Sequence, residues 1–226
     1  MGYDQIFNKM VKIYNSGHHK ERGLSLYKTI KDVIENSIPG DFVECGVASG
    51  KSSCIGLLTM LSLNDNSKDI WLYDTYEGVE GQKGGFDKPL ERDIAHNGKS
   101  AIEEWETGNL SRFEYEVSDV WVKNKLLQTG YPEEKIKIIK GKVEDTIPQH
   151  TPKEISILRL DTDFYLSTKH ELEHLYPLLS EGGYLLLDDY GHWNGCKEAV
   201  HEYFGGKPEK AFMGDYTLLV YKKESK

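Results

Sequence analysis

The amino-acid sequence predicts an α/β fold built on a mostly parallel β-sheet. Short apolar runs alternate with helical stretches over most of the chain, which is the pattern of βαβ units. The first run leads into a glycine-rich turn and two later runs end in aspartates, as expected where the loops at the carboxyl ends of parallel strands hold ligands. The predicted strands are Phe42–Cys45, Ile70–Tyr73, Ile136–Ile139, Ile155–Leu160 and Tyr184–Leu187.

Residues 1–40 precede this repeating unit and are predicted to form a helical extension that packs on the core or covers it as a lid. The apolar side chains of its helical pattern fall on one face, at Tyr27, Ile30, Val33 and Ile34. Pro39-Gly40 then ends the pattern. Residues 41–226 show no linker and no internal repeat, and they are predicted to form one domain.

Two parts of this domain depart from the alternation of strands and helices. Residues 77–112 are irregular, first glycine-rich and then of mixed charge, and long insertions of this kind tend to be active-site lids or disordered segments. Near the C-terminus, Tyr216–Tyr221 follows Ala211–Met213 too closely for a crossover helix, so a terminal antiparallel hairpin is expected.

Composition narrows the possible functions. The 226 residues carry 28 Lys and Arg against 37 Asp and Glu, a net charge of −9, which argues against a general binder of nucleic acids or anionic membranes. Cys45, Cys54 and Cys196 match no disulfide framework and no zinc-site spacing, which favours a reducing compartment. Because we find no run of ~18 apolar residues and no secretory signal, a cytoplasmic protein is expected.

The glycine-rich turn lies within Asp41–Ser53, between the first strand and a helix expected to begin near Lys51. A P-loop needs four residues between its glycines, whereas Gly46 and Gly50 have three between them. Glu44 at the strand end would also repel a triphosphate, but it suits a cation such as the ammonium or sulfonium group of S-adenosylmethionine (SAM). A tight strand-to-helix turn that binds no ligand stays open as the alternative.

Asp74 ends the second predicted strand, 30 residues after Glu44. A carboxylate at this position accepts hydrogen bonds from ribose hydroxyls in dinucleotide-binding folds. A nicotinamide cofactor is disfavoured because the turn Gly46–Gly50 lacks the Gly-x-Gly-x-x-Gly pattern. An aspartate after a strand is also a common helix cap, so this second role for the carboxylate stays open.

Four aspartates follow the last two parallel strands: Asp161, Asp163, Asp188 and Asp189. A helix predicted over 167–179, and ended by Glu181-Gly-Gly183, joins these strands as parallel neighbours. They should meet at one edge of the sheet, where their mutual repulsion requires a positive partner. Oxygen ligands suit Mg²⁺ or Ca²⁺, and Mg²⁺ keeps positions open for substrate oxygens. Solvated acidic loops or helix caps are the alternative. His192 follows the cluster and is equally compatible with a substrate contact and with an exposed loop.

His170-Glu-Leu-Glu-His174 matches the H-E-x-x-H pattern of zinc proteases. The apolar face of the same helix is expected to carry Leu172, Leu175 and Leu179, which places both histidines nearly opposite, toward solvent. A zinc protease would need the two histidines in a cleft, so a solvated polar face is expected instead.

Taken together, the motifs between residues 40 and 205 resemble the macrocin O-methyltransferase (TylF-type) family, in the order of that family. They are Glu44-Cys-Gly-Val47 with Ser49-Gly50, Tyr73-Asp-Thr-Tyr-Glu-Gly78, Asp161-Thr-Asp-Phe-Tyr165 with Ser167-Thr168, Leu175-Tyr-Pro177, Gly182-Gly183, Asp188-Asp-Tyr190 and Gly195-Cys-Lys-Glu-Ala-Val200. The resemblance implies a class I SAM-dependent methyltransferase fold, with a Rossmann-like seven-stranded sheet that is mostly parallel, an antiparallel last strand and helices on both faces. It also implies Mg²⁺-dependent methylation of a sugar hydroxyl.

The resemblance further implies roles for individual residues. Cofactor contacts would come from three places: Glu44, Cys45, Gly46, Ser49 and Gly50 at the methionine end of SAM, Asp74 and Thr75 at its ribose, and Gly141, Lys142 and Val143 at its adenine. Ser118 and Asp161 would be further cofactor contacts. The metal ligands would be Asp161, Asp188 and Asp189. Asp163 would be the general base, with His192 as the alternative and Asp161 beside them in catalysis.

In the expected reaction, the methyl group of SAM moves in line to a hydroxyl of a saccharide, a nucleotide sugar or a glycosylated natural product. Mg²⁺ would lower the pKa of that hydroxyl and orient it. A catechol-type small-molecule methyltransferase would use the same metal chemistry, and a P-loop-like kinase or a non-catalytic binding domain is a more remote alternative. The sequence names neither the acceptor nor the hydroxyl methylated, and it leaves a homo-oligomer open.

Overall fold

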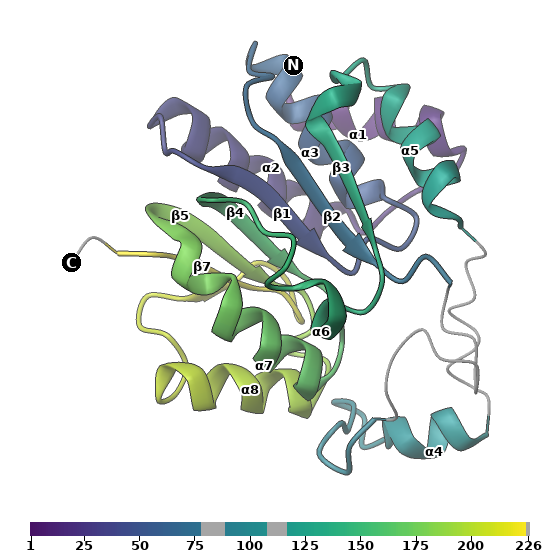
Figure 1. Ribbon diagram of the computed structural model, residues 1–226, viewed down its shortest axis with the longest axis vertical. Coiled ribbons are helices and arrows are strands. Elements are labelled where there is room, and N and C mark those ends of the chain that lie inside the picture. Colours follow the sequence, from purple (N-terminus) through teal and green to yellow (C-terminus); the bar gives the residue numbers. More distant parts are fainter. Residues whose placement is uncertain (78–88, 108–116, 225–226) are drawn as a thin grey trace.

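The computed structural model describes residues 1–77, 89–107 and 117–224. The strands among these residues form one seven-stranded sheet in the order β3-β2-β1-β4-β5-β7-β6 (Figure 1). The strands are β1 Asp41–Cys45, β2 Ile70–Asp74, β3 Ile136–Lys140, β4 Ile155–Leu160, β5 Leu179–Leu187, β6 Phe212–Met213 and β7 Leu219–Lys222. Each of the predicted strands is present, and β5 begins five residues before its predicted start at Tyr184.

The first five strands run parallel, and β7 runs antiparallel to both of its neighbours, β5 and β6. The predicted terminal hairpin and antiparallel last strand are therefore confirmed. The order of the strands reverses between β1 and β4, which are adjacent in the sheet but not consecutive in the chain. In open α/β sheets, ligands bind at such a reversal, outside the carboxyl ends of the strands.

Helices cover both faces of the sheet (Figure 1). One face is packed against α1 Tyr3–Tyr14, α2 Lys20–Glu35, α3 Lys51–Ser62 and α5 Asp119–Leu127, and the other against α6 Val143–Thr146, α7 Tyr165–His174 and α8 Asn194–Phe204. Because neighbouring residues of a strand point to opposite faces, Phe42 belongs to the first core cluster and Val43 to the second. Short 3-10 turns at Glu133–Lys135 and Tyr176–Leu178 precede β3 and β5.

The N-terminal helices α1 and α2 are packed on the domain. Ile6 and Met10 of α1 and Ile30 and Val33 of α2 are fully buried in the same core cluster as α3. Apolar burial of this extent stabilises a fixed position of the two helices. The division of the chain at residue 40 stays a prediction.

One helix ends earlier than the sequence indicated. We predicted a helix over 167–179 that the two glycines after Glu181 would end, but α7 stops at His174 and β5 already begins at Leu179. Pro177, in the 3-10 turn between them, cannot continue an α-helix because it lacks an N–H group. The two glycines lie inside β5, where Gly182 has a φ of +79°.

None of the helices in the described ranges combines the length and the hydropathy needed to span a membrane. Of the predicted insertion, residues 78–88 and 108–112 lie outside the described residues. Its described part, 89–107, contains the short helix α4 Ala101–Glu106.

Candidate functional site

The glycine turn, residues 46–50, follows β1 and ends where α3 begins at Lys51, as predicted. Gly46 has a φ of +79°, and a Cβ atom on it would lie 1.9 Å from the carbonyl oxygen of Asp161. Gly50 adopts a left-handed conformation as the N-cap of α3, and its N–H donates to the carbonyl oxygen of Val47 at 2.8 Å. Glycine is required at residue 46 because the turn after β1 touches the backbone that leaves β4.

Asp74 binds the glycine turn directly. Its Oδ2 atom accepts the N–H groups of Val47 and Ala48 at 2.7 and 2.8 Å, and its Oδ1 atom accepts the N–H of Tyr76 at 2.8 Å. The carboxylate at the end of β2 therefore holds the turn after β1 in shape. This hydrogen bonding had no signal in the sequence beyond the position of an aspartate at a strand end, and the predicted ribose contact of Asp74 and Thr75 stays a prediction.

Glu44 and Cys45 lie beneath the turn and are fully buried. The Glu44 Oε1 atom accepts a hydrogen bond from Arg159 Nη1 at 2.6 Å, and the Ser53 hydroxyl donates to Oε2. Burial raises the pKa of Glu44 to about 7, although Arg159 acts in the opposite direction. Arg159 of the neighbouring strand is therefore the cation that contacts Glu44 in this structure, and the predicted contacts of Glu44 and Cys45 with the cofactor stay predictions.

The remaining predicted cofactor residues lie after β3, at the start of α5 and in the glycine turn. Gly141 lies at the carboxyl end of the sheet, where its N–H donates to the carbonyl oxygen of Asp74 at 3.0 Å. The next two residues begin α6, with Lys142 as the N-cap and Val143 buried. Ser118 is the N-cap of α5, and its hydroxyl accepts the N–H of Trp121 at 3.2 Å. Ser49 is half-buried in the glycine turn.

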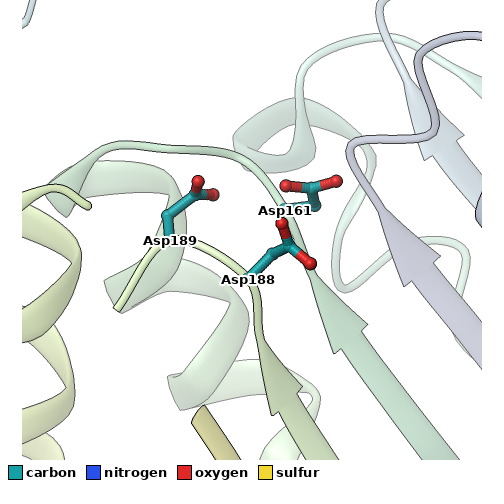
Figure 2. A group of neighbouring side chains, drawn as sticks. All are labelled: Asp161, Asp188 and Asp189. Carbon is teal, nitrogen blue, oxygen red and sulfur yellow. The ribbon is translucent and has the colours of Figure 1, made fainter. Parts of the chain in front are cut away.

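The predicted acidic cluster is brought together at the ends of β4 and β5. Figure 2 shows Asp161 after one strand and Asp188 after its neighbour, with their carboxylates side by side and Asp189 one residue further along. Each of the three residues has a carboxylate oxygen within 4.8 Å of the others. Asp188 is fully buried, Asp189 is buried and Asp161 is half-buried. We refer to these three residues and Asp163 as the acidic edge.

Two arginines that sequence reasoning missed contact the acidic edge. Arg159 Nη2 lies 2.8 Å from carboxylate oxygens of both Asp161 and Asp188. Arg22 of α2 donates through Nη1 to the other oxygen of Asp188, through Nε to Asp215 at 3.0 Å and through Nη2 to the Thr217 hydroxyl at 2.7 Å. The N-terminal helices therefore supply part of this site. Arg159 had a recognisable signal, since it stands two residues before Asp161 on a strand buried on both faces.

Asp163 completes the acidic edge. It has a φ of +66°, its N–H donates to Asp189 Oδ2 at 3.1 Å, and its Oδ1 accepts the indole N–H of Trp193 at 2.9 Å. Burial raises the pKa of Asp163 to about 7 and that of Asp188 to about 6, and the charge of Asp161 acts in the same direction on both. Burial likewise raises the pKa of Asp189 well above its usual range. The acidic edge thus holds four carboxyl groups against two arginines.

His192 lies at the rim of the acidic edge, beside a second histidine from the insertion. Its ring atom Nδ1 is 3.2 Å from Nδ1 of His96. The backbone N–H of His96 donates to the backbone carbonyl oxygen of His192 at 2.8 Å. Burial lowers the pKa of His192, and the neighbouring His96 and Arg22 lower it further. His96 had no signal in the sequence, because nothing there showed where the insertion folds back.

Residues 89–107 are attached to the site through a buried aspartate. Asp93 accepts the N–H of Tyr165 at 3.0 Å, and a Cβ atom on Gly195 would lie 1.7 Å from its Oδ1 atom. A small core cluster joins the same segment to both loops of the site, through Ala95, Ala101, Phe164, Trp193 and Cys196. The described part of the insertion therefore packs against the loops that carry the acidic edge, and its function as a lid stays a prediction.

The H-E-x-x-H residues do not form a metal site. The rings of His170 and His174 lie 4.2 Å apart, and His170 Nε2 lies 3.0 Å from the carbonyl oxygen of Ile147. Both histidines are half-buried rather than fully turned to solvent, because α6 packs against this side of α7. Glu171 between them is fully buried and directed elsewhere. In the described ranges, the acidic triad is the one group of three or more side chains placed to hold a metal.

The sheet order, the glycine turn after β1 and the acidic residue ending β2 define a class I methyltransferase fold. The profile of the Macrocin-O-methyltransferase (TylF) family matches residues 18–211, and the chain belongs to that family. Among solved structures, the O-methyltransferase NovP superposes with a TM-score of 0.77 at 24% sequence identity, over 93% of this chain and 84% of NovP.

Curated relatives have named activities. The chain is 30% identical over 185 residues to 8-demethyl-8-(2,3-dimethoxy-alpha-L-rhamnosyl)-tetracenomycin-C 4'-O-methyltransferase of Streptomyces olivaceus, covering 80% of this chain and 64% of that enzyme. It is 32% identical over 185 residues to demethyldecarbamoylnovobiocin O-methyltransferase of Streptomyces niveus, covering 79% of this chain and 63% of that enzyme. The chain thus spans just under two thirds of the length of these relatives.

Proposed function

We propose that this chain is a SAM-dependent O-methyltransferase that methylates a sugar hydroxyl. The observation that carries the proposal is the direct contact between the glycine turn and the acidic edge. The N–H of Asp161 donates to the carbonyl oxygen of Cys45 at 2.9 Å, and Gly46 packs against the carbonyl of Asp161. A methyl donor on the turn and an acceptor at the acidic edge would therefore be neighbours, and such positioning of two reactants supplies ~7–11 kcal/mol of a barrier.

The cofactor would lie across the carboxyl ends of β1, β2 and β3. Its methionine end would meet the turn from Gly46 to Gly50, its ribose Asp74, and its adenine the residues from Gly141 onward. The hydrogen bond from Gly141 to the backbone of Asp74 supports this arrangement, because it places the ribose and adenine residues side by side. The turn is also held in place by Asp74, so its backbone is ordered for a ligand.

The acidic edge suits a divalent cation. All of the donor atoms are carboxylate oxygens, which Mg²⁺ prefers, and the four carboxylates of the acidic edge are contacted by two arginines. We propose Asp161, Asp188 and Asp189 as the Mg²⁺ ligands. Bound Mg²⁺ would supply Lewis-acid chemistry, lowering the pKa of the acceptor hydroxyl and orienting it.

Asp163 is the proposed general base. A carboxyl group whose pKa is raised to about 7 is well matched to removing a proton near neutral pH. The indole of Trp193 and the left-handed backbone at Asp163 fix the direction of this side chain. His192, whose pKa is lowered and whose ring contacts His96, is the alternative base at the rim.

For the acceptor, we propose a sugar of a glycosylated small molecule. The two relatives from Streptomyces are named for methylation of a rhamnosyl-tetracenomycin and of demethyldecarbamoylnovobiocin, and the rhamnosyl group in the first of these supports a glycoside here. Arg22 of the N-terminal extension donates to Asp188, so residues 1–40 would contribute to the place where the acceptor is proposed to bind. A homo-oligomer stays part of the proposal without a described interface.

The first test is calorimetric titration of the purified protein with S-adenosylhomocysteine, with and without Mg²⁺. Binding in the micromolar range, ~−8 kcal/mol, would support the methyltransferase assignment. Labelled SAM would then be offered with sugars that bear adjacent hydroxyls and, in parallel, with catechols. Label transferred to sugars alone would support the proposed acceptor class, label on catechols alone would replace it, and a folded protein that binds no S-adenosylhomocysteine would contradict the assignment.

A further inference from the structure

Glu171, the glutamate of the H-E-x-x-H motif, is a fully buried carboxyl group that the proposed reaction does not use. It lies on α7, behind the loop that leaves β4. Its Oε2 atom accepts the hydroxyl of Thr162 at 3.0 Å, and the thiol of Cys45 lies beside the same carboxyl group. Its Oε1 atom is buried without a hydrogen-bond partner among the described residues.

Thr162 is the residue between two proposed site carboxylates, Asp161 and Asp163. Its carbonyl oxygen accepts the N–H of Phe164 at 2.7 Å and the hydroxyl of Ser167 at 3.1 Å. The backbone therefore makes a tight reversal at Thr162, and Asp163 follows in a left-handed conformation, which is unfavourable for a residue other than glycine. The hydroxyl of Thr162 is bound by Glu171 of α7.

A buried oxygen without a partner is destabilising, and an unbranched apolar side chain at residue 171 would avoid that cost. The burial of Glu171 also raises its pKa well above the usual range. The Thr162 hydroxyl donates to this carboxyl group all the same.

We propose that Glu171 is a positioning residue: as a buried hydrogen-bond acceptor for Thr162, it holds the loop of residues 161–164 so that Asp161 and Asp163 face the acidic edge. The inference rests on the proposed function only in what Asp161 and Asp163 do there. The H-E-x-x-H pattern thus has a structural use in this chain that involves no zinc.

The test compares three variants with the wild-type chain: Glu171→Gln, which keeps an acceptor oxygen, Glu171→Met, which removes it, and Glu173→Met, an exposed change two residues further along α7. Hydrogen exchange of the segment 161–166 is measured without metal, together with the thermal midpoint. The N–H of Asp163 reports the loop directly because it donates to Asp189. Binding of Mn²⁺, followed by electron paramagnetic resonance, is the second measurement.

In Glu171→Met we expect about tenfold faster exchange at Asp163 and Phe164 and about tenfold weaker Mn²⁺ binding, the size of effect typical for residues that orient metal ligands. Its thermal midpoint should equal or exceed that of the wild type, because the unpartnered oxygen is gone. Glu171→Gln and Glu173→Met should stay within about twofold of the wild type in exchange and Mn²⁺ binding. A purely structural role would instead move the midpoint downward and leave Mn²⁺ binding unchanged.

Wild-type exchange in Glu171→Met would overturn the proposal, and so would a Glu171→Gln variant that matches Glu171→Met. If Glu171→Met fails to fold, Thr162→Val decides, because it removes the donor and leaves Glu171 in place. Faster exchange in Thr162→Val would support the proposal, and unchanged exchange would overturn it. A wild-type chain that binds no Mn²⁺ would contradict the proposed metal site, while the exchange rates would still decide the role of Glu171.

Discussion

The glycine turn and the acidic edge touch each other at one end of the sheet, but they satisfy their polar groups in opposite ways. In the turn, the N–H groups of Val47 and Ala48 are bound by one carboxylate, Asp74. At the acidic edge, Asp188 is contacted by the two arginines, and burial still raises its pKa. The N–H groups of Val47 and Ala48 in the turn therefore have an acceptor within the chain, whereas the acidic edge holds four carboxyl groups against two arginines.

This difference indicates how each region meets a ligand. A turn whose backbone is already ordered loses little conformational entropy on binding, so it favours a rigid match to one cofactor. An acidic edge with raised pKa values gains when a cation takes the place of bound protons. A substitution within the turn should therefore affect cofactor binding alone, and a substitution at the acidic edge should affect metal binding alone.

The largest effect is expected where the two regions touch. In Gly46→Ala, the new Cβ atom would lie 1.9 Å from the Asp161 carbonyl oxygen at a φ of +79°. Overpacking of about 1–3 kcal/mol adds to backbone strain of about 1–2 kcal/mol, so the free energy of unfolding should fall by about 2–5 kcal/mol. Gly130→Ala is the matched control, since Gly130 has a φ of +90° and no atom within 4 Å. Urea denaturation should show a loss of only about 1–2 kcal/mol there, and equal losses would contradict the contact.

The next effect should separate chemistry from cofactor binding. Asp161→Asn removes one proposed metal ligand and weakens the pairing of Arg159 with the acidic edge. We expect the rate of methyl transfer to fall by roughly 100-fold or more, beyond the 10–100-fold typical of residues that only orient ligands. Affinity for S-adenosylhomocysteine, measured by calorimetry, should change by less than about threefold, which converts to under 1 kcal/mol. Asp145→Asn, at an exposed aspartate of α6, is the control, and turnover that survives Asp161→Asn would refute the role of the ligand.

The sequence predicted the elements that local patterns specify. The alternation of apolar runs and helices identified the five parallel strands, and the short spacing near the C-terminus identified the antiparallel hairpin. The ends of β4 and β5 placed Asp161 and Asp188 together because parallel neighbours share an edge. Gly46 was recognised as part of a turn, but its contact with Asp161 required knowing that β1 and β4 are neighbours.

Partners that come from distant segments were missed for the same physical reason. Arg22 stands 166 residues before Asp188 and His96 stands 96 residues before His192, and no periodic pattern links residues so far apart. Arg159, the partner of Glu44, was missed as well, although a carboxylate that is buried on one strand is matched by a guanidinium on the neighbouring one. The predicted contact of Glu44 with a cationic group of SAM stays a prediction.

A smaller effect is expected when the turn loses its acceptor. Asp74→Asn places an amide N–H₂ group where two carboxylate oxygens accept three backbone N–H groups. The turn should loosen, and affinity for S-adenosylhomocysteine should fall about tenfold, equivalent to ~1.4 kcal/mol. Mn²⁺ binding at the acidic edge should stay unchanged. Asp65→Asn makes the same change in a turn at the other end of the sheet, where Asp65 accepts the N–H of Ser67, and a similar loss of affinity there would exclude a specific role for Asp74.

The smallest effect concerns pH, and it tests the excess charge of the acidic edge. The pKa of Asp163 is raised to about 7 and that of Asp188 to about 6, against about 4 in the unfolded chain. The folded protein therefore keeps protons that the unfolded chain releases, and this contribution to stability is present below pH ~4 and is lost as the pH rises to ~7.

Mg²⁺ competes with the same protons, so the stabilisation that it provides should grow between pH 5 and 8. We expect the difference in thermal midpoint between Mg²⁺ and EDTA to increase by a few degrees, where 1 kcal/mol is roughly 2–4 °C for a chain of this size. Taking the difference cancels groups outside the acidic edge, such as Asp215, whose pKa is lowered. A difference that does not change with pH would show that the carboxyls of the acidic edge are already ionised, and that the arginines alone balance their charge.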